Sequence, residues 1–216
     1  MVEQEGVIKY TLDFQRQVVR LNPKILREIN HSRQLMIDNA LLGQDDERYC
    51  GYGFGNISCR GDGSNTCFVI TGSQTGHLRH LSNDSFACIS KINSKQNTLH
   101  ACGETEPSSE SMTHGVLYQQ HCQIRAVVHV HSPDIWHASG CLNLASTAKE
   151  IPYGTPEMAH AVQALTCALM KRNAALPMLF VMKGHEDGVV AAGASLAQCN
   201  AVILDTLQRA KQCANA

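Results

Sequence analysis

Apolar residues recur along the chain with two different spacings, which predict helices and strands in alternation. Between residues 23 and 42 they recur every three or four positions, as on one buried face of a helix, and a proline suits the first turn. Residues 155–172 repeat this spacing after Thr, Pro and Glu, a strong signature of a helix start. Short β-branched runs predict strands. We expect helices at 23–42, 109–121, 155–172 and 196–210, a helix start at 81–85, and strands at 56–60, 66–71, 86–92, 126–130, 178–182 and 188–192.

Most of the predicted strands are joined by short turns, which favours antiparallel pairing. GDGS at 61–64 is a good hairpin turn between two of them. Because helices interleave with these strands, we expect an α/β fold in which a largely antiparallel sheet carries helices on both faces. A chain of 216 residues without repeats or a long linker fits one domain. We therefore assign residues 1–216 to a single domain, with 1–22 as an N-terminal extension in which 7–14 has the pattern of a short strand.

Composition and charge exclude several classes of function. The formal net charge of −1 gives no bulk attraction to nucleic acid or to an anionic membrane. No apolar run approaches the ~18–20 residues that span a bilayer, and the N-terminus has no secretory pattern. The ten cysteines include no Cys-x-x-Cys pair. We expect them to be reduced and mostly buried in a cytoplasmic protein.

The segment RAVVHVHS at 125–132 carries two histidines inside an apolar run. On a strand, His129 and His131 point to one face while Val128 and Val130 point to the other. Imidazole is the commonest protein ligand for borderline metals. The pair therefore suggests part of a metal site, although two polar residues on a half-buried strand would have the same pattern.

Two further motifs could complete such a site. His185 lies in KGHEDG, a polar turn between two apolar strands, and Glu110 lies in PSSESMTH at a predicted helix start. A surface turn and a helix cap are the ordinary explanations for these two motifs. Catalytic zinc, however, takes three protein ligands and keeps one open position, whereas structural zinc takes four and usually thiolates. Since no cysteine has suitable spacing, a catalytic site is favoured over a structural one.

Two glycine-rich segments have the composition of anion-binding loops. GFGNIS contains Asn56 and Ser58, and TGSQTG contains Thr75 and Gly76. Outward-facing backbone N–H groups in such loops bind oxyanions or phosphates. Tight turns that join strands have the same composition. Neither segment matches a nucleotide-binding fingerprint, so nucleotide binding is disfavoured.

Taken in order, these motifs resemble the class II aldolase/adducin N-terminal domain family. The similarity extends from residue 23 to residue 210. The motifs that carry it are GNIS (55–58), ITGSQTG (70–76), SSE (108–110), AVVHVHS (126–132), YGTPEMA (153–159) and KGHEDG (183–188).

The resemblance implies a fold and a set of site residues. The fold is a three-layer α/β/α sandwich around a mostly antiparallel sheet, in cyclic homotetramers with the active site at a subunit boundary. Glu110 falls on the general acid/base, which can also complete the coordination of the metal. The zinc ligands fall on His129, His131 and His185, and the substrate-phosphate pocket falls on Asn56, Thr75, Gly76, Ser108 and Ser109.

The implied activity is that of a zinc-dependent lyase that cleaves or forms an aldol bond. Its substrate is a small hydroxy-carbonyl compound of carbohydrate metabolism, phosphorylated or not, and its cofactor is Zn²⁺ or another divalent transition metal. The metal acts as a Lewis acid and the carboxylate moves the proton. Relatives use the same pocket for epimerase or dehydratase reactions. A non-catalytic, adducin-like binding module is the alternative from another class of function.

Several features depart from the family pattern. The turn GHEDG adds Glu186 and Asp187 beside the metal ligand, where either could lower the net charge of the metal or repel a phosphate. The tail tyrosine of the sugar-phosphate aldolases is not found, and Tyr153 or a neighbouring subunit is expected to replace it. Trp136, the single tryptophan, is expected to line the open coordination position.

Overall fold

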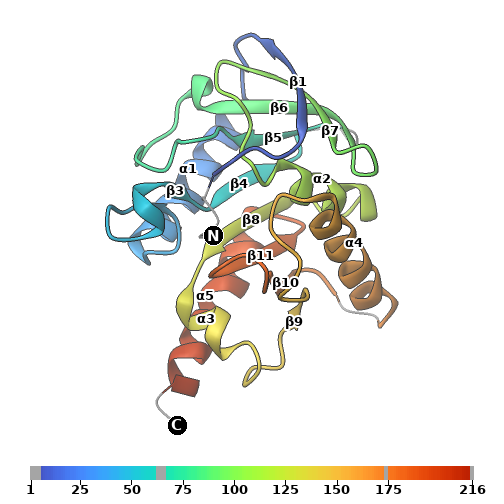
Figure 1. Ribbon diagram of the computed structural model, residues 1–216. Coiled ribbons are helices and arrows are strands. Elements are labelled where there is room, and N and C mark those ends of the chain that lie inside the picture. The colour runs from blue at the N-terminus through green and yellow to red at the C-terminus, as the bar shows by residue number, and fades with distance from the viewer. Residues whose placement is uncertain (1–5, 62–66, 173–174, 215–216) are drawn as a thin grey trace.

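The computed structural model describes residues 6–61, 67–172 and 175–214. Its main feature is a nine-stranded sheet in the order β1-β7-β6-β5-β4-β8-β11-β10-β9 (Figure 1). Among the described strands only the outermost pairs, β1 with β7 and β9 with β10, are parallel. The strands are β1 (Thr11–Arg16), β4 (Asn56–Cys59), β5 (Phe68–Thr71), β6 (Phe86–Asn93), β7 (Thr98–Gly103), β8 (Ala126–His131), β9 (Ala145–Ser146), β10 (Met178–Val181) and β11 (Gly188–Gly193), and a separate pair is formed by β2 (Gly43–Gln44) and β3 (Gly53–Phe54).

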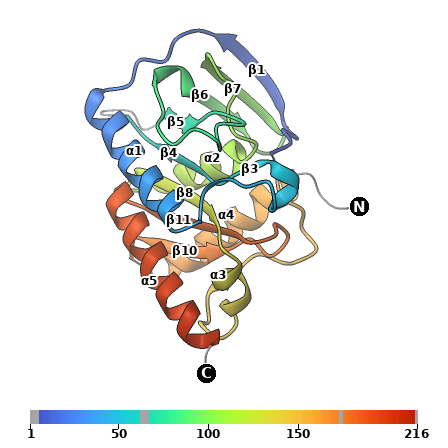
Figure 2. The same ribbon diagram turned by 90° about the vertical axis from the view of Figure 1, so that its left-hand side faces the viewer.

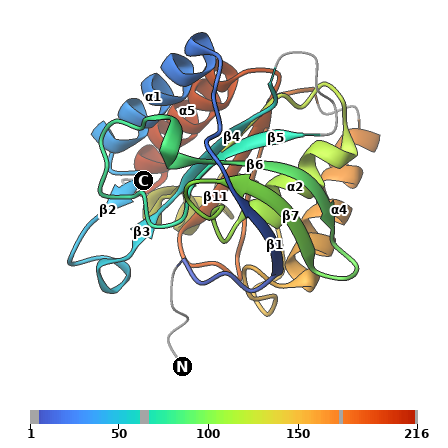
Figure 3. The same ribbon diagram turned by 90° about the horizontal axis from the view of Figure 1, so that it is seen from above.

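Helices cover both faces of the sheet. One face carries α1 and α5, with α3 packed against α5, and the other carries α2 and α4. Figures 2 and 3 show the two groups on opposite sides of the strands. The predicted α/β fold with a mostly antiparallel sheet between helical layers is confirmed. The helices are α1 (Pro23–Asp38), α2 (Ser111–Gln120), α3 (Pro133–Ala138), α4 (Pro156–Lys171) and α5 (Leu196–Ala214), and short 3₁₀ turns are η1 (Tyr49–Gly51) and η2 (Asn83–Ser85).

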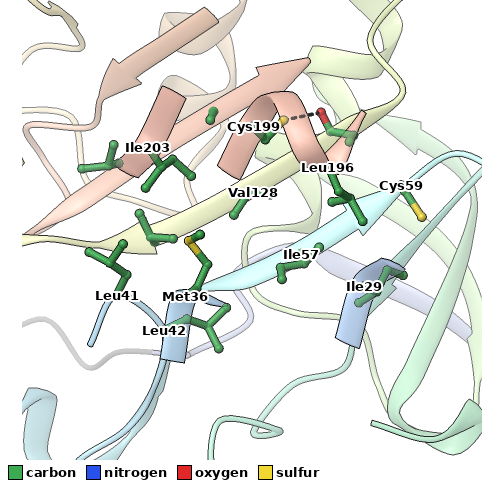
Figure 4. Close-up of a cluster of buried hydrophobic side chains, with 14 of the residues drawn as sticks. Ile29, Met36, Leu41, Leu42, Ile57, Cys59, Val128, Leu196, Cys199 and Ile203 are labelled. Atoms are coloured by element: carbon green, nitrogen blue, oxygen red, sulfur yellow. Dashed lines mark hydrogen bonds between the residues drawn. The ribbon is translucent and has the colours of Figure 1, made fainter. Parts of the chain in front are cut away.

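The strand β8 lies at the centre of the sheet, between β4 and β11. All six of its residues are buried because both neighbours are paired and both faces are covered, which explains the near-continuous apolar run in its sequence. Val128 and Val130 join the core under α1 and α5, while Val127 joins the core under α2 and α4. The histidines, which alternate with Val128 and Val130, therefore face the α2/α4 layer. Figure 4 shows Val128 in the α1/α5 core beside Ile57 and Met36.

The ends of the helices follow from their sequences. Thr155 caps α4 by accepting a hydrogen bond from the Met158 amide at 3.2 Å, with Pro156 at the first position. Asn22 caps α1 through the Lys24 amide at 2.9 Å. The helix α1 ends at Asp38, four residues before its predicted end, and α2 begins at Ser111, so that Glu110 is the N-cap residue and not part of the first turn.

The structure corrects several of the sequence predictions. The N-terminal extension contains a true edge strand, β1, which begins at Thr11 and pairs with β7. The strand β7 and the helix α3 were not predicted, because a short alternating strand and a six-residue helix give weak periodicity. The predicted hairpin turn at 61–64 extends outside the described residues, although β4 and β5 pair as expected. The assignment of the whole chain to one domain stays a prediction.

The cysteine prediction was wrong in two respects. Cys141 and Cys213 form a disulfide that joins the segment after α3 to the end of α5. Among the free cysteines only Cys59 and Cys199 are fully buried, and Cys50 and Cys122 are exposed. An even distribution along the sequence gives no sign of which cysteines meet in space, and that is why composition could not identify the bonded pair.

Candidate metal centre

Strand pairing brings three histidines together. His129 and His131 lie on β8, and His185 lies in the turn between β10 and β11. The strand β11 pairs with β8 so that Gly188 is opposite His131, which places the turn at the end of β8. Each histidine offers a ring nitrogen within 4.8 Å of the others, and all three side chains are buried.

The turn that carries His185 is fixed by its own backbone. The His185 amide donates to the Met182 carbonyl at 3.1 Å, and the Gly188 amide donates to the His185 carbonyl at 3.0 Å. At position 184, a Cβ atom would lie 1.7 Å from the Ile151 carbonyl oxygen, so only glycine fits. His185 is thus held on a turn pressed against the segment around residue 151.

The two imidazoles on β8 are in the protonation state that binds metal. Burial holds the pKa of His129 and of His131 well below the ordinary value, so both rings are neutral at neutral pH. His129 Nδ1 lies 3.1 Å from the Val189 carbonyl oxygen, to which a neutral ring donates, leaving Nε2 as the lone-pair nitrogen. His129 Nε2 is buried and has no hydrogen-bond partner among the described residues. Three buried imidazoles, two of them held neutral and one with such an atom, fit a divalent transition metal.

A buried carboxylate completes the cluster. The Glu110 side chain is 1% exposed, and its Oε1 lies 3.9 Å from His185 Nδ1. Although Glu110 is the N-cap residue of α2, its side chain makes no capping hydrogen bond. The helix-cap explanation of this glutamate is therefore not supported, and its carboxylate faces the histidines.

Aromatic rings surround the histidines. Tyr49 and Phe54 contact the His131 ring, with centroid distances of 4.7 and 5.6 Å. Tyr153 is 1% exposed and stacks on the His185 ring at 4.3 Å and 16°. Trp136, expected to line the open position, instead donates from Nε1 to the carbonyls of Met182 (3.2 Å) and His185 (3.1 Å). It braces the backbone of the turn.

The two acidic residues of the turn differ in environment. Glu186 is exposed. Asp187 is 8% exposed, and its Oδ2 accepts a hydrogen bond from the Tyr49 hydroxyl at 2.6 Å. Burial and this hydrogen bond both raise the pKa of Tyr49, which stays protonated. Asp187 therefore holds Tyr49, the ring that contacts His131.

The residues predicted to bind phosphate lie at the start of β4 and on two loops that are joined to each other. Asn56 pairs with His129 across β4 and β8, and its Oδ1 is buried without a hydrogen-bond partner in the described chain. The loop of Thr75 and Gly76 is joined to the loop of Ser108 and Ser109 through a bridge between Gly72 and Pro107. Thr75, Ser108 and Ser109 are buried, and Gly76 is partly exposed.

Sequence reasoning missed Arg33, a residue of α1 whose side chain hydrogen-bonds to the glycine-rich loop. Its side chain is 1% exposed, Nη2 donates to the carbonyls of Thr75 (2.7 Å) and Gly76 (3.0 Å), and Nε donates to that of Leu78 (2.7 Å). Burial lowers its pKa to about 10, so the guanidinium stays charged at neutral pH. Its place between Ile29 and Met36 on the apolar face of α1 was the available signal.

A buried polar chain lies behind the histidines on the same face. Ser58 Oγ is 2.7 Å from His114 Nδ1 and 2.8 Å from the Tyr118 hydroxyl. Burial lowers the pKa of His114 to about 3, so this ring is neutral. By contrast, His77 and His80, considered as further candidates because they follow a glycine loop, are exposed.

Known structures share this fold at low sequence identity. An L-fuculose 1-phosphate aldolase superposes with a TM-score of 0.63 at 18% identity, covering 90% of this chain and 88% of that one. The sugar-phosphate aldolase from Thermotoga maritima gives 0.62 at 14% identity, with 87% and 92% covered. YgbL from Escherichia coli, for which aldolase, epimerase and decarboxylase activities have been suggested, gives 0.62 at 17% identity, with 88% and 87% covered.

The sequence itself carries the family signal. No curated protein matches the chain at a significant level. The sequence profile of the Class II Aldolase and Adducin N-terminal domain, however, matches residues 40–212, a span that includes all three histidines and Glu110. The predicted resemblance is confirmed, and the chain belongs to the class II aldolase and adducin N-terminal domain family.

Proposed function

We propose that the protein is a metal-dependent carbon–carbon lyase of the class II aldolase type, acting on a small hydroxy-carbonyl compound of carbohydrate metabolism. The observation that carries the proposal is the convergence of three buried imidazoles within 4.8 Å, with a buried carboxylate 3.9 Å from one of them. Burying these groups is unfavourable unless a ligand or partner compensates for it. A divalent metal bound to the three imidazoles would be such a ligand.

The proposed metal ligands are His129, His131 and His185, and the proposed metal is Zn²⁺ or another divalent transition metal. A metal bound there supplies Lewis acidity toward the oxygen atoms of the substrate. The hydrogen bond from His129 Nδ1 to Val189 fixes which nitrogen faces the centre. The stacking of Tyr153 on His185 fixes the plane of the third ring.

Glu110 is the proposed acid/base. In the direction of bond formation its carboxylate oxygen takes a proton from the substrate carbon as the C–C bond forms, and the new hydroxyl oxygen takes up a proton in exchange. Cleavage reverses both transfers, so the carbon regains its proton from the same carboxyl oxygen. Its buried place beside His185 supports this role, because it puts the carboxylate next to a proposed metal ligand.

The proposed substrate anchor is the group Asn56, Thr75, Gly76, Ser108 and Ser109. Holding a substrate at a distance from the reacting carbons supplies positioning. Asn56 supports the proposal because its buried amide lies next to His129 in the sheet. The surroundings of Gly76 add to it, since a Cβ atom there would lie 2.4 Å from the Gly43 carbonyl oxygen, so that the loop keeps a bare backbone.

Metal analysis and two substitutions test the proposal. We expect about one equivalent of divalent metal in the purified protein, loss of that metal in His129→Ala, and loss of turnover with retained metal in Glu110→Gln. The assay uses a panel of hydroxy-ketones, phosphorylated and not. A protein without metal whose properties are unchanged by His129→Ala would indicate an adducin-like binding module instead.

The same panel separates the enzymatic alternatives. An epimerase would invert a carbinol centre and a dehydratase would release water, whereas a lyase would yield two carbonyl fragments. The suggested activities of YgbL, which shares the fold, keep the epimerase alternative in view.

Assembly and location are part of the proposal. We propose a homotetramer, which light scattering tests directly. No described helix is long and apolar enough to cross a membrane. We also propose a cytoplasmic location. Reducing compartments disfavour disulfides, so alkylating the protein's thiols at the moment of lysis tests it: a cytoplasmic protein should have Cys141 and Cys213 reduced, and a bonded pair would count against that location.

A further inference from the structure

Residues 6–10 lie before β1 and outside the span that matches the family profile. Nevertheless they lie against three segments that support or adjoin the metal centre. We propose that this segment forms a wall of the site, with Lys9 and Tyr10 as positioning residues for His185 and Glu110. The inference concerns the geometry of the proposed site and rests on the proposed function only where metal binding is measured.

The first contact joins Lys9 to the support of His185. Lys9 Nζ donates to the Tyr153 carbonyl at 2.9 Å and lies 4.0 Å from the centroid of the Tyr153 ring. That ring stacks on His185. A cation over an aromatic face is attracted to the ring, so the ammonium holds both the backbone and the ring of Tyr153.

The backbone near Tyr153 also touches the turn directly. Gly184 packs against the Ile151 carbonyl so closely that no side chain fits between them. Residues 151–153 therefore connect Lys9 with the backbone and with the imidazole of His185. A shift of this segment must move the turn.

The second contact joins Tyr10 to the loop before Glu110. The Tyr10 side chain is 5% exposed, and its hydroxyl lies 2.9 Å from the Ser108 carbonyl and 3.3 Å from that of Pro107. The Ser111 hydroxyl also donates to the Ser108 carbonyl, at 2.6 Å. These hydrogen bonds fix the backbone from which Glu110 enters the site.

The third contact places the segment against the glycine-rich loop. A Cβ atom at Gly6 would lie 2.7 Å from Gln74 Nε2. The segment itself is held by the sheet, since Asn97 Nδ2 donates to the Lys9 carbonyl at 2.9 Å and the Thr11 amide donates to the Asn97 carbonyl at 2.8 Å. Residues 6–10 are thus anchored at the sheet edge and span the loops that carry the site.

Hydrogen–deuterium exchange of the metal-free full chain tests the wall. The variants are Lys9→Ala and Tyr10→Phe, with Lys9→Arg as the conservative exchange. The control is Arg16→Ala, which removes an exposed ion pair with Glu104 from the same N-terminal region. We expect at least tenfold faster exchange at 150–155 and 183–188 in Lys9→Ala and at 107–112 in Tyr10→Phe, with Lys9→Arg and the control unchanged.

Cobalt binding provides the second readout. Co²⁺ reports ligand geometry through its visible absorption, and its affinity is measured by competition with a chelator. Loss of a supporting contact around a metal ligand typically weakens binding about 10–100-fold. We therefore expect about a tenfold weaker Co²⁺ affinity and an altered spectrum in Lys9→Ala, with parent values in Lys9→Arg.

The outcomes separate the two proposals. If Lys9→Ala and Tyr10→Phe exchange no faster than Arg16→Ala, the proposal that residues 6–10 position His185 and Glu110 is overturned. A parent protein that takes up no Co²⁺ would overturn the metal-dependent function, while the exchange data would still decide the wall. If Tyr10→Phe unfolds, Lys9→Ala, whose side chain is only half-buried, decides alone.

Discussion

Each histidine of the candidate centre is held by a different kind of contact. His129 is held by a backbone carbonyl, His131 by contact with two aromatic rings, and His185 by a stacked tyrosine. Rings fixed in this way lose little further freedom when a ligand binds, which favours tight binding. The sequence predicts the three histidines, but these supports lie far from them along the chain, and single-chain patterns do not pair distant residues.

Asp187 also shows that sequence alone does not reveal which residue a side chain contacts. The sequence placed a carboxylate beside the metal ligand and left its role open, and the structure pairs it with Tyr49. Tyr49 has a φ of 49° and Asp187 a φ of 59°, a backbone region that residues other than glycine seldom occupy. Strained residues of this kind concentrate at functional sites. The hydrogen bond between their side chains links the turn that carries His185 to the aromatic ring that contacts His131.

We expect Tyr49→Phe to destabilise the protein by about 1–3 kcal/mol, because the buried Asp187 carboxylate loses a donor. Urea unfolding of the parent and the variant measures the difference. The control is Glu186→Gln. Glu186 is the exposed neighbour of Asp187, so this change should leave the free energy of unfolding nearly unchanged. Equal stability of Tyr49→Phe and the parent would show that this hydrogen bond is not formed.

At the scale of elements, the long helices and the central strands were predictable because their patterns are strong. The helix α4 has a capping threonine, a first-turn proline and an apolar face, and it begins at Pro156 as expected. The strand β7 alternates buried and half-buried residues over only six positions, and β1 owes its place to pairing with β7. The strand β1 overlaps the short strand expected at 7–14 but begins at Thr11, because its limits are set by the pairing with β7. The pattern of β7 itself was too short and too weak to predict a strand.

Two elements meet at the glycine-rich loop, where α1 supplies Arg33. We expect Arg33→Met to cost about 3 kcal/mol, since it removes the charged donor that the carbonyls of Thr75, Gly76 and Leu78 share in a buried or partly buried setting. If the loop binds the phosphate of a substrate, KM for a phosphorylated substrate should rise more than KM for its unphosphorylated analogue.

The control for this test is Arg27→Met on the same helix, because Arg27 is exposed. Unfolding in urea and the two KM values are measured on all three proteins. A variant at Arg33 that is as stable as the Arg27 control would contradict the role assigned to the guanidinium.

At the scale of the whole molecule, the buried histidines of the candidate site make the fold more stable at neutral pH than in acid. His114, His129 and His131 are fully buried on one face of the central sheet, and burial lowers the pKa of each. In the unfolded chain a histidine titrates near pH 6.5. Below that value the unfolded state binds protons that the folded state does not, so acid favours unfolding.

We therefore expect the metal-free protein to lose stability steeply as pH falls from 7.5 to 5.5. Each of the three histidines contributes about 1.4 kcal/mol over this interval, and together they contribute about 4 kcal/mol. Since domains are stable by roughly 5–15 kcal/mol, this loss is a large share of the total. Urea unfolding of the chelator-treated protein at the two pH values gives the difference. His114→Gln, which leaves the proposed metal ligands in place, should reduce it by about a third, and the same pH dependence in that variant and the parent would show that His114 is protonated in the folded state.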